Sequence, residues 1–155
     1  MTETTTPSET TQSEQPQEPE FTSWEDLVAE YPVLTDGFPD LVKPENMTIT
    51  QSIQFGFIRD AILAKQAKMQ QLVTKVSVDD ESTLIEVSSL IAQTIEMISD
   101  YFRTLASSVK KFDAWGRGRD PETLRATFYA LMNFYGAQLG KSVRSKTSTG
   151  STESN

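Results

Sequence analysis

The chain has 155 residues, and its 22 acidic and 14 basic side chains give a formal net charge of −8 at pH 7. This length suits one domain, and the negative charge opposes general attraction to nucleic acid or anionic membranes. Cysteine and histidine are both absent, which excludes disulfides, thiolate nucleophiles, Ser-His-Asp triads and metal sites built on either residue. We therefore expect a protein that is not an enzyme and that holds no cofactor or metal.

Polar segments flank the part of the chain that can form a core. Residues 1–20 contain one hydrophobic side chain, Met1, and residues 142–155 contain one, Val143. Such segments bury too little surface to offset the entropy of ordering. We predict a disordered acidic tail over 1–20, a helical domain over 21–141 and a disordered Ser/Thr-rich tail over 142–155. With no signal peptide and no apolar run of about 18 residues, the expected location is the cytoplasm.

The first predicted helix is short. Thr22-Ser-Trp-Glu25 has the form of a capping box, in which hydroxyl and carboxylate satisfy each other's backbone donors. The helix would run through Glu30, with Trp24 anchoring it to the core. Residues 31–47, which contain three prolines, are predicted to be irregular, and Phe38 and Leu41 are expected to hold this loop against the core.

A second capping box, Thr48-Ile-Thr-Gln51, predicts a helix that runs to about Val76. Apolar residues recur through it at helical spacing. They include Ile53, Phe57, Ile58, Ala61, Ile62, Met69, Leu72, Val73 and Val76, and the polar face carries Arg59, Lys65, Lys68 and Lys75. The β-branched stretch from Val73 to Val78 leaves an extended conformation open as an alternative.

The clearest periodic pattern begins after the acidic segment Asp79-Asp80-Glu81, which suits a helix N-terminus. Apolar residues then follow every three or four positions. This helical seam consists of Leu84, Val87, Ile91, Ile95, Ile98, Phe102, Leu105, Val109 and Phe112. The spacing predicts one continuous helix of about 30 residues, or about 45 Å. Leu90, Met97 and Tyr101 widen the seam, which favours a bundle over a two-stranded coil.

The last predicted helix follows Gly116-Arg-Gly-Arg119, where the pattern breaks. Asp120-Pro121 supplies an N-cap with proline at the first helical position, and Gly140-Lys141 is typical of a helix end. Its apolar face consists of Leu124, Phe128, Leu131, Met132, Tyr135 and Leu139. The expected fold is all-α, a small bundle of three main helices plus one short N-terminal helix.

Three polar patterns suggest chemistry, and each has a simpler interpretation. Gly116-Arg-Gly-Arg119 precedes a helix, but its spacing fits neither the dinucleotide-binding motif nor the P-loop, so a solvated turn is favoured. Asp79-Asp80-Glu81 lacks the alternating ligands of a calcium loop, so a helix cap is favoured. Glu96 and Asp100 lie one turn apart on the long helix, and without histidine they fit a solvated face better than a di-iron site.

Aromatic residues gather around the last two predicted helices, where core packing is the favoured interpretation. Four of them surround more of the last helix than one neighbour can cover. We therefore predict that its exposed part contacts a partner protein, through Phe128, Tyr129, Phe134 and Tyr135.

The last third of the chain resembles the tail assembly chaperones of long-tailed (siphovirus-type) bacteriophages. The resemblance runs from Phe112-Asp-Ala-Trp-Gly-Arg-Gly to Leu131-Met-Asn-Phe-Tyr-Gly-Ala-Gln-Leu-Gly-Lys-Ser142, and the small acidic helical domain with polar ends fits it. It implies a chaperone that keeps the tape measure protein soluble in the host cytoplasm during virion assembly and is absent from the finished virion.

This resemblance also implies two products from one start. The longer arises by −1 ribosomal frameshifting and recruits tail tube subunits, and this chain would be the shorter form. Gly140-Lys141 is compatible with the slip sequence G-GGA-AAA, because GGA-AAA encodes Gly-Lys.

Two other interpretations remain open at the level of sequence. A self-assembling structural or scaffold protein, or a generic protein-interaction module, would use the helical seam as an interface between copies. A nucleic-acid-binding regulator would use the basic residues Lys110, Lys111, Arg117, Arg119 and Arg125, but the net charge and the lack of a recognition-helix motif argue against it.

Overall fold

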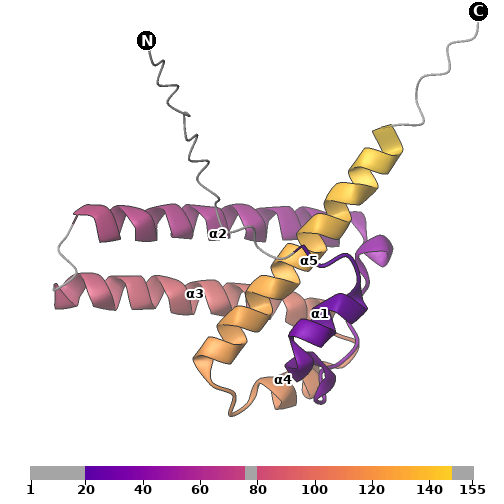
Figure 1. The fold of residues 1–155 in the computed structure, drawn as a ribbon, viewed down its shortest axis with the longest axis horizontal. Helices are drawn as coiled ribbons and strands as arrows, with labels where there is room; N and C mark the ends of the chain where they lie inside the picture. The colour runs from indigo at the N-terminus through magenta and orange to yellow at the C-terminus, as the bar shows by residue number, and fades with distance from the viewer. Residues whose placement is uncertain (1–19, 76–79, 148–155) are drawn as a thin grey trace, which may run out of the picture.

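Figure 1 shows the computed structural model, which describes the backbone of residues 20–75 and 80–147 and the side chains through residue 140. Within these ranges the chain forms five α-helices and two 3₁₀ turns. The helices are α1 (Trp24–Glu30), α2 (Ile49–Lys75), α3 (Glu81–Leu105), α4 (Val109–Gly116) and α5 (Pro121–Thr147), and the turns are Pro32–Thr35 and Pro44–Asn46. The all-α class is confirmed, with one helix more than the sequence predicted.

The helices form a long hairpin and a compact body at its base. Helices α2 and α3 lie side by side over their whole length, and α5 crosses them at a steep angle (Figure 1). Helices α1 and α4 and the irregular segment between α1 and α2 gather around the crossing. The end of the hairpin where α2 finishes and α3 begins extends beyond this body (Figure 1).

The two predicted capping boxes have different outcomes. At α2 the box is confirmed, because the Thr48 N–H donates to Gln51 Oε1 at 2.9 Å and the Gln51 N–H donates to Thr48 Oγ1 at 3.2 Å. At α1 the N-cap is Ser23, whose hydroxyl accepts from the Asp26 N–H. The predicted box is therefore wrong by one residue, and hydroxyl donors, led by Thr22 at 2.7 Å, lower the pKa of Asp26.

The predicted continuous helix through the seam is wrong, because α3 ends at Leu105. The irregular segment pairs with the chain there. The Val42 N–H donates to the Leu105 carbonyl at 2.9 Å, and the Ser107 N–H donates to the Asp40 carbonyl at 2.8 Å. Ser108 then caps α4 with its hydroxyl. The apolar spacing continues across this break. Such spacing indicates which side chains face the core, but it does not indicate whether the backbone hydrogen bonds of one helix are continuous.

Burial along the seam follows the neighbours of α3. Ile98, Phe102, Leu105 and Phe112 are buried, Val87, Ile91 and Ile95 are partly buried, and Leu84 and Val109 are exposed. Towards the N-terminal end of α3 the buried positions are Thr83, Leu90 and Thr94, each one residue earlier than a seam residue. This shift arises because α2 is the main neighbour of that part of α3, whereas α5 adds a second neighbour nearer its C-terminal half (Figure 1).

Helix α5 continues through Gly140 to Thr147, beyond the end predicted at Lys141. A glycine ends a helix when it adopts a positive φ, and among the described residues only Gly37 and Gly118 do so. The backbone of residues 142–147, predicted to be disordered, is therefore helical. The rest of both predicted tails, apart from Glu20, and the alternative extended stretch at Val76–Val78 lie outside the described residues.

The core surrounds α5 and is rich in aromatic rings, as the sequence predicted. The rings of Phe102 and Tyr135 meet edge to face at 5.2 Å. The Tyr135 hydroxyl donates to the Val42 carbonyl at 2.7 Å, and the Tyr101 hydroxyl donates to the Gln51 carbonyl at 2.8 Å. Two buried tyrosines thus fix α2 and the irregular segment to α3 and α5.

We predict that these tyrosines make the domain sensitive to alkali. Burial raises the pKa of Tyr101 to about 12 and raises that of Tyr135 further, whereas an unfolded tyrosine titrates near 10. Their stabilising contribution is complete below about pH 10 and is lost as pH rises through the folded pKa values.

Urea unfolding at a series of pH values should therefore give a free energy of unfolding that falls above about pH 10, by up to about 1.4 kcal/mol per pH unit for each tyrosine. Tyr101→Phe/Tyr135→Phe should flatten this decline. Equal slopes in the wild type and the double variant would contradict the prediction.

Candidate functional site

The four aromatic residues predicted to contact a partner are not an exposed surface. Phe128, Phe134 and Tyr135 are buried, and Tyr129 is partly buried. The prediction of an exposed aromatic face on α5 is wrong because this helix has several neighbours. Phe134 meets Trp24 of α1, Tyr135 meets α3, and Phe128 packs against the aromatic rings of α4.

The loop after α4 is more structured than a solvated turn. The Arg119 guanidinium donates to the Trp115 carbonyl at 2.7 Å, lies 4.9 Å from the centre of the indole ring and pairs with Asp36 at 3.1 Å. Trp115 in turn donates from Nε1 to the Val33 carbonyl. Arg125 pairs with Glu122. Two of the five basic residues considered for nucleic acid are therefore engaged within the domain.

Helix α2 carries large apolar side chains on two opposite sides. Phe55 and Ile62 point into the core, with Phe55 only 3% exposed. On the other side Ile49 is 81% exposed and Ile53 and Phe57, one and two turns later, are 53% and 70% exposed. We call these three residues the outer stripe. Exposed apolar side chains grouped on one side of a helix are typical of a contact surface, and the other described residues leave more than half of each of these three side chains exposed.

The sequence pattern did not distinguish these two sides. It placed Ile53 and Phe57 on the apolar face and did not include Phe55, the most buried residue of α2. Contact with α5 accounts for the burial of Phe55, whose ring lies 3.8 Å from where a Cβ of Gly136 would be, an ordinary van der Waals distance.

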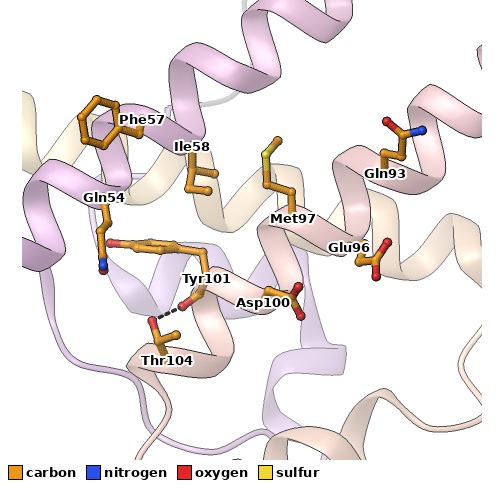
Figure 2. Close-up of a pocket in the computed structure, with 9 residues that line it drawn as sticks. All are labelled: Gln54, Phe57, Ile58, Gln93, Glu96, Met97, Asp100, Tyr101 and Thr104. Carbon is orange, nitrogen blue, oxygen red and sulfur yellow. Dashed lines mark hydrogen bonds between the residues drawn. The ribbon is translucent and has the colours of Figure 1, made fainter.

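A groove of about 530 Å³ lies between α2 and α3, beside the outer stripe (Figure 2). It is open to solvent. Phe57 and Ile58 line it from α2, and Met97 and Tyr101 line it from α3. Figure 2 shows Phe57 on the α2 side, the Met97 and Tyr101 side chains between the helices, and the carboxylates of Glu96 and Asp100 along α3. The remaining lining residues are Gln54, Gln93 and Thr104.

Most polar groups of the groove already have partners inside the domain. Gln93 accepts from the Lys65 ammonium at 3.0 Å, Thr104 donates to the Tyr101 carbonyl, and the Tyr101 hydroxyl is bonded to Gln51. Glu96 and Asp100 differ, because both are exposed and neither forms an ion pair or hydrogen bond with a described residue. The groove thus combines an apolar floor with two available negative charges.

The chemistry of this site suits binding. An apolar floor edged by fixed amide and hydroxyl groups is typical of a docking surface. Across residues 20–75 and 80–147, no three acidic side chains gather in a way that would hold a metal ion. In the same part of the chain, no helix combines the length and hydrophobicity needed to cross a membrane.

Comparison with known proteins found no matching family model, no matching curated protein and no matching solved structure.

Two neighbouring phenylalanines of α2 give a direct test of this arrangement. We predict that Phe55→Ala lowers the free energy of unfolding by about 3–5 kcal/mol, because it empties a core position. Phe57→Ala should change it by no more than about 0.5 kcal/mol, because the ring is exposed. Urea unfolding of the two variants measures both effects. Comparable losses at the two positions would show that Phe57 also supports the isolated domain.

Proposed function

We propose that this protein is a bacteriophage tail assembly chaperone that binds the tape measure protein in the host cytoplasm and keeps it soluble during tail morphogenesis. In this proposal the protein performs no catalytic step, and it leaves before the virion is complete. Tail tube subunits are a further partner, through a longer frameshifted product. The resemblance of residues 112–142 to this family supports the proposal.

The structural observation that carries the proposal is the outer stripe. Ile49, Ile53 and Phe57 expose large apolar surfaces on one side of a helix that is already packed on the other. An apolar helical stripe of this kind fits another amphipathic helix, and a tape measure protein is a long helix-rich chain that needs its apolar side chains covered. Many copies that each bind weakly would cover it reversibly.

A second candidate function is self-assembly, favoured by the exposed end of the α2–α3 hairpin. Val73, Leu84 and Ile85 are all more than half exposed there. An interface between copies at this end would bury them. Light scattering distinguishes the two candidates, since a stable oligomer in the absence of any client that is dissociated by Ile85→Glu favours the structural role.

We predict that the chain raises the soluble yield of the tape measure protein when the two are co-expressed. Ile49→Ser/Ile53→Ser should reduce this yield severalfold, because it removes two contacts of the outer stripe. Val109→Ser, which replaces an exposed apolar residue of α4, is the matched control and should act as the wild type.

Circular dichroism of the purified variants should remain unchanged, because both isoleucines are exposed. A soluble yield of the client that is the same with and without the protein would rule out the chaperone function. A yield that is equally high with the stripe variant would place the client contact elsewhere.

A second product from the same gene is the other expected outcome. Expression of the gene with its downstream DNA and an N-terminal tag should give a minor longer species by intact mass, diverging after Gly140-Lys141. Synonymous codons at these two positions, which leave the protein sequence unchanged, should abolish the longer species. A single product from the native gene would remove the frameshifting part of the proposal.

A further inference from the structure

We infer that the groove between α2 and α3 binds a helical segment of a partner protein that presents an apolar face flanked by lysine or arginine residues. This inference adds a binding site to the proposed function. It rests on the proposed function only where it identifies the partner as the tape measure protein. It assigns the binding site, and it states the chemistry that the bound segment must have.

The apolar part of the groove supplies the affinity. Phe57, which is largely exposed, stands at its α2 edge, and Ile58, Met97 and the ring of Tyr101 form its floor. Methionine adapts to differently shaped partners, and a large aromatic ring at the edge of an apolar site is typical of an energetic hot spot. Burying Phe57 under a partner would remove the largest exposed aromatic ring of the described residues from water.

The two carboxylates supply the charge preference. Glu96 and Asp100 lie four residues apart, about 6 Å along α3 at about 1.5 Å per residue, on the same side of the groove (Figure 2). The nearby basic side chains bond to other residues. Arg103 donates two hydrogen bonds to the Asp113 carboxylate, at 2.8 and 3.0 Å, and the Lys65 ammonium donates one to Gln93. The charge of Arg103 also acts on Asp100, but the two form no ion pair. Two basic residues one turn apart on a bound helix would therefore meet two carboxylates that form no direct ion pair or hydrogen bond with a described residue.

The shape of the groove selects a helix as its occupant. It lies between two adjacent helices and is open to solvent, so a third helix can lay its apolar face along it. The described residues offer no sheet edge there that could pair with an extended peptide. The volume is within the range of about 300–1,000 Å³ found for small-molecule pockets, but the exposed Phe57 edge and open side give a small ligand little enclosure.

A second copy of this chain fits the groove poorly. In a two-fold symmetric contact the same surface appears on both sides. Both copies would then bring Glu96 and Asp100 into the interface, the groove lining offers no lysine or arginine to pair with them, and the chain as a whole carries a formal charge of −8. Such juxtaposed like charges oppose association. Charge complementarity therefore favours a basic partner over self-association through this groove.

The test uses the full chain and two synthetic helical peptides. Both peptides carry leucines at positions i, i+4 and i+7 in an alanine background. One has lysines flanking the leucine face, and the other has glutamates at the same positions. Fluorescence anisotropy, supported by NMR shifts of the labelled protein, should show the basic peptide binding at least about tenfold more tightly than the acidic one.

Variants locate the contact. Glu96→Gln/Asp100→Asn should reduce the preference for the basic peptide to about threefold or less and weaken its salt dependence. Phe57→Ser should weaken the binding of the basic peptide by about tenfold or more. Glu25→Gln/Glu30→Gln removes two exposed carboxylates from α1 and serves as the control for net charge, with affinity within about twofold of the wild type.

Three results would overturn the inference. They are an absence of binding by the basic peptide up to about 1 mM, equal affinity for the two peptides, and wild-type binding by Glu96→Gln/Asp100→Asn. If instead the peptide binds as expected but the tape measure protein is not kept soluble, the chaperone proposal is wrong and the groove is still a binding site for a basic helix. If the groove variants protect the tape measure protein as well as the wild type does, the groove is not the client site and the chaperone proposal is retained.

Discussion

The contact between Phe102 of α3 and Tyr135 of α5 holds together the two parts of this domain. Tyr135 is almost fully buried, and its hydroxyl also binds the Val42 carbonyl of the irregular segment. One side chain therefore connects the hairpin, the crossing helix and the segment that ends α3. Because α5 is fixed in this way, its remaining aromatic residues meet α1 and α4, and the body forms around it.

This arrangement concentrates the core at one end of the hairpin. The large buried side chains cluster where α5 crosses α2 and α3, whereas the other end keeps exposed apolar residues and is joined by the ion pair of Lys68 with Glu86. Resistance to local opening follows the density of buried contacts. The domain thus separates a well-packed body, which maintains the fold, from a hairpin whose outer surfaces remain available for contacts.

The sequence predicted the helices well and their neighbours poorly. Caps and breakers act locally, so Thr48 with Gln51, Asp80 and Asp120 correctly marked the starts of α2, α3 and α5. The break at Leu105 depends on backbone bonds from Asp40 and Val42, which are distant in the chain. The burial of Phe55 and not Phe57 depends on which side of α2 faces α5. Neither relation is visible in a one-dimensional pattern.

The candidate site shows the same division. The excess of aromatic residues on α5 suggested a partner surface, but that excess reflects how many neighbours α5 has. The groove was not predicted, because the sequence pattern assigned Glu96 and Asp100 to a solvated helix face and Phe57 to the core. Only the packing of α2 against α3 brings these residues together. The engagement of Arg119 with Trp115 and Asp36 likewise required the fold.

The hydrogen bond from Tyr101 to the first turn of α2 has a consequence for the groove. Its hydroxyl is held by the Gln51 carbonyl, so the ring that lines the groove has little freedom to rotate. This part of the groove is therefore preorganised, and fixing the Tyr101 ring would cost little conformational entropy if the inferred helix binds there. More of the ordering cost would then fall on that helix, so its intrinsic helicity would contribute to its affinity.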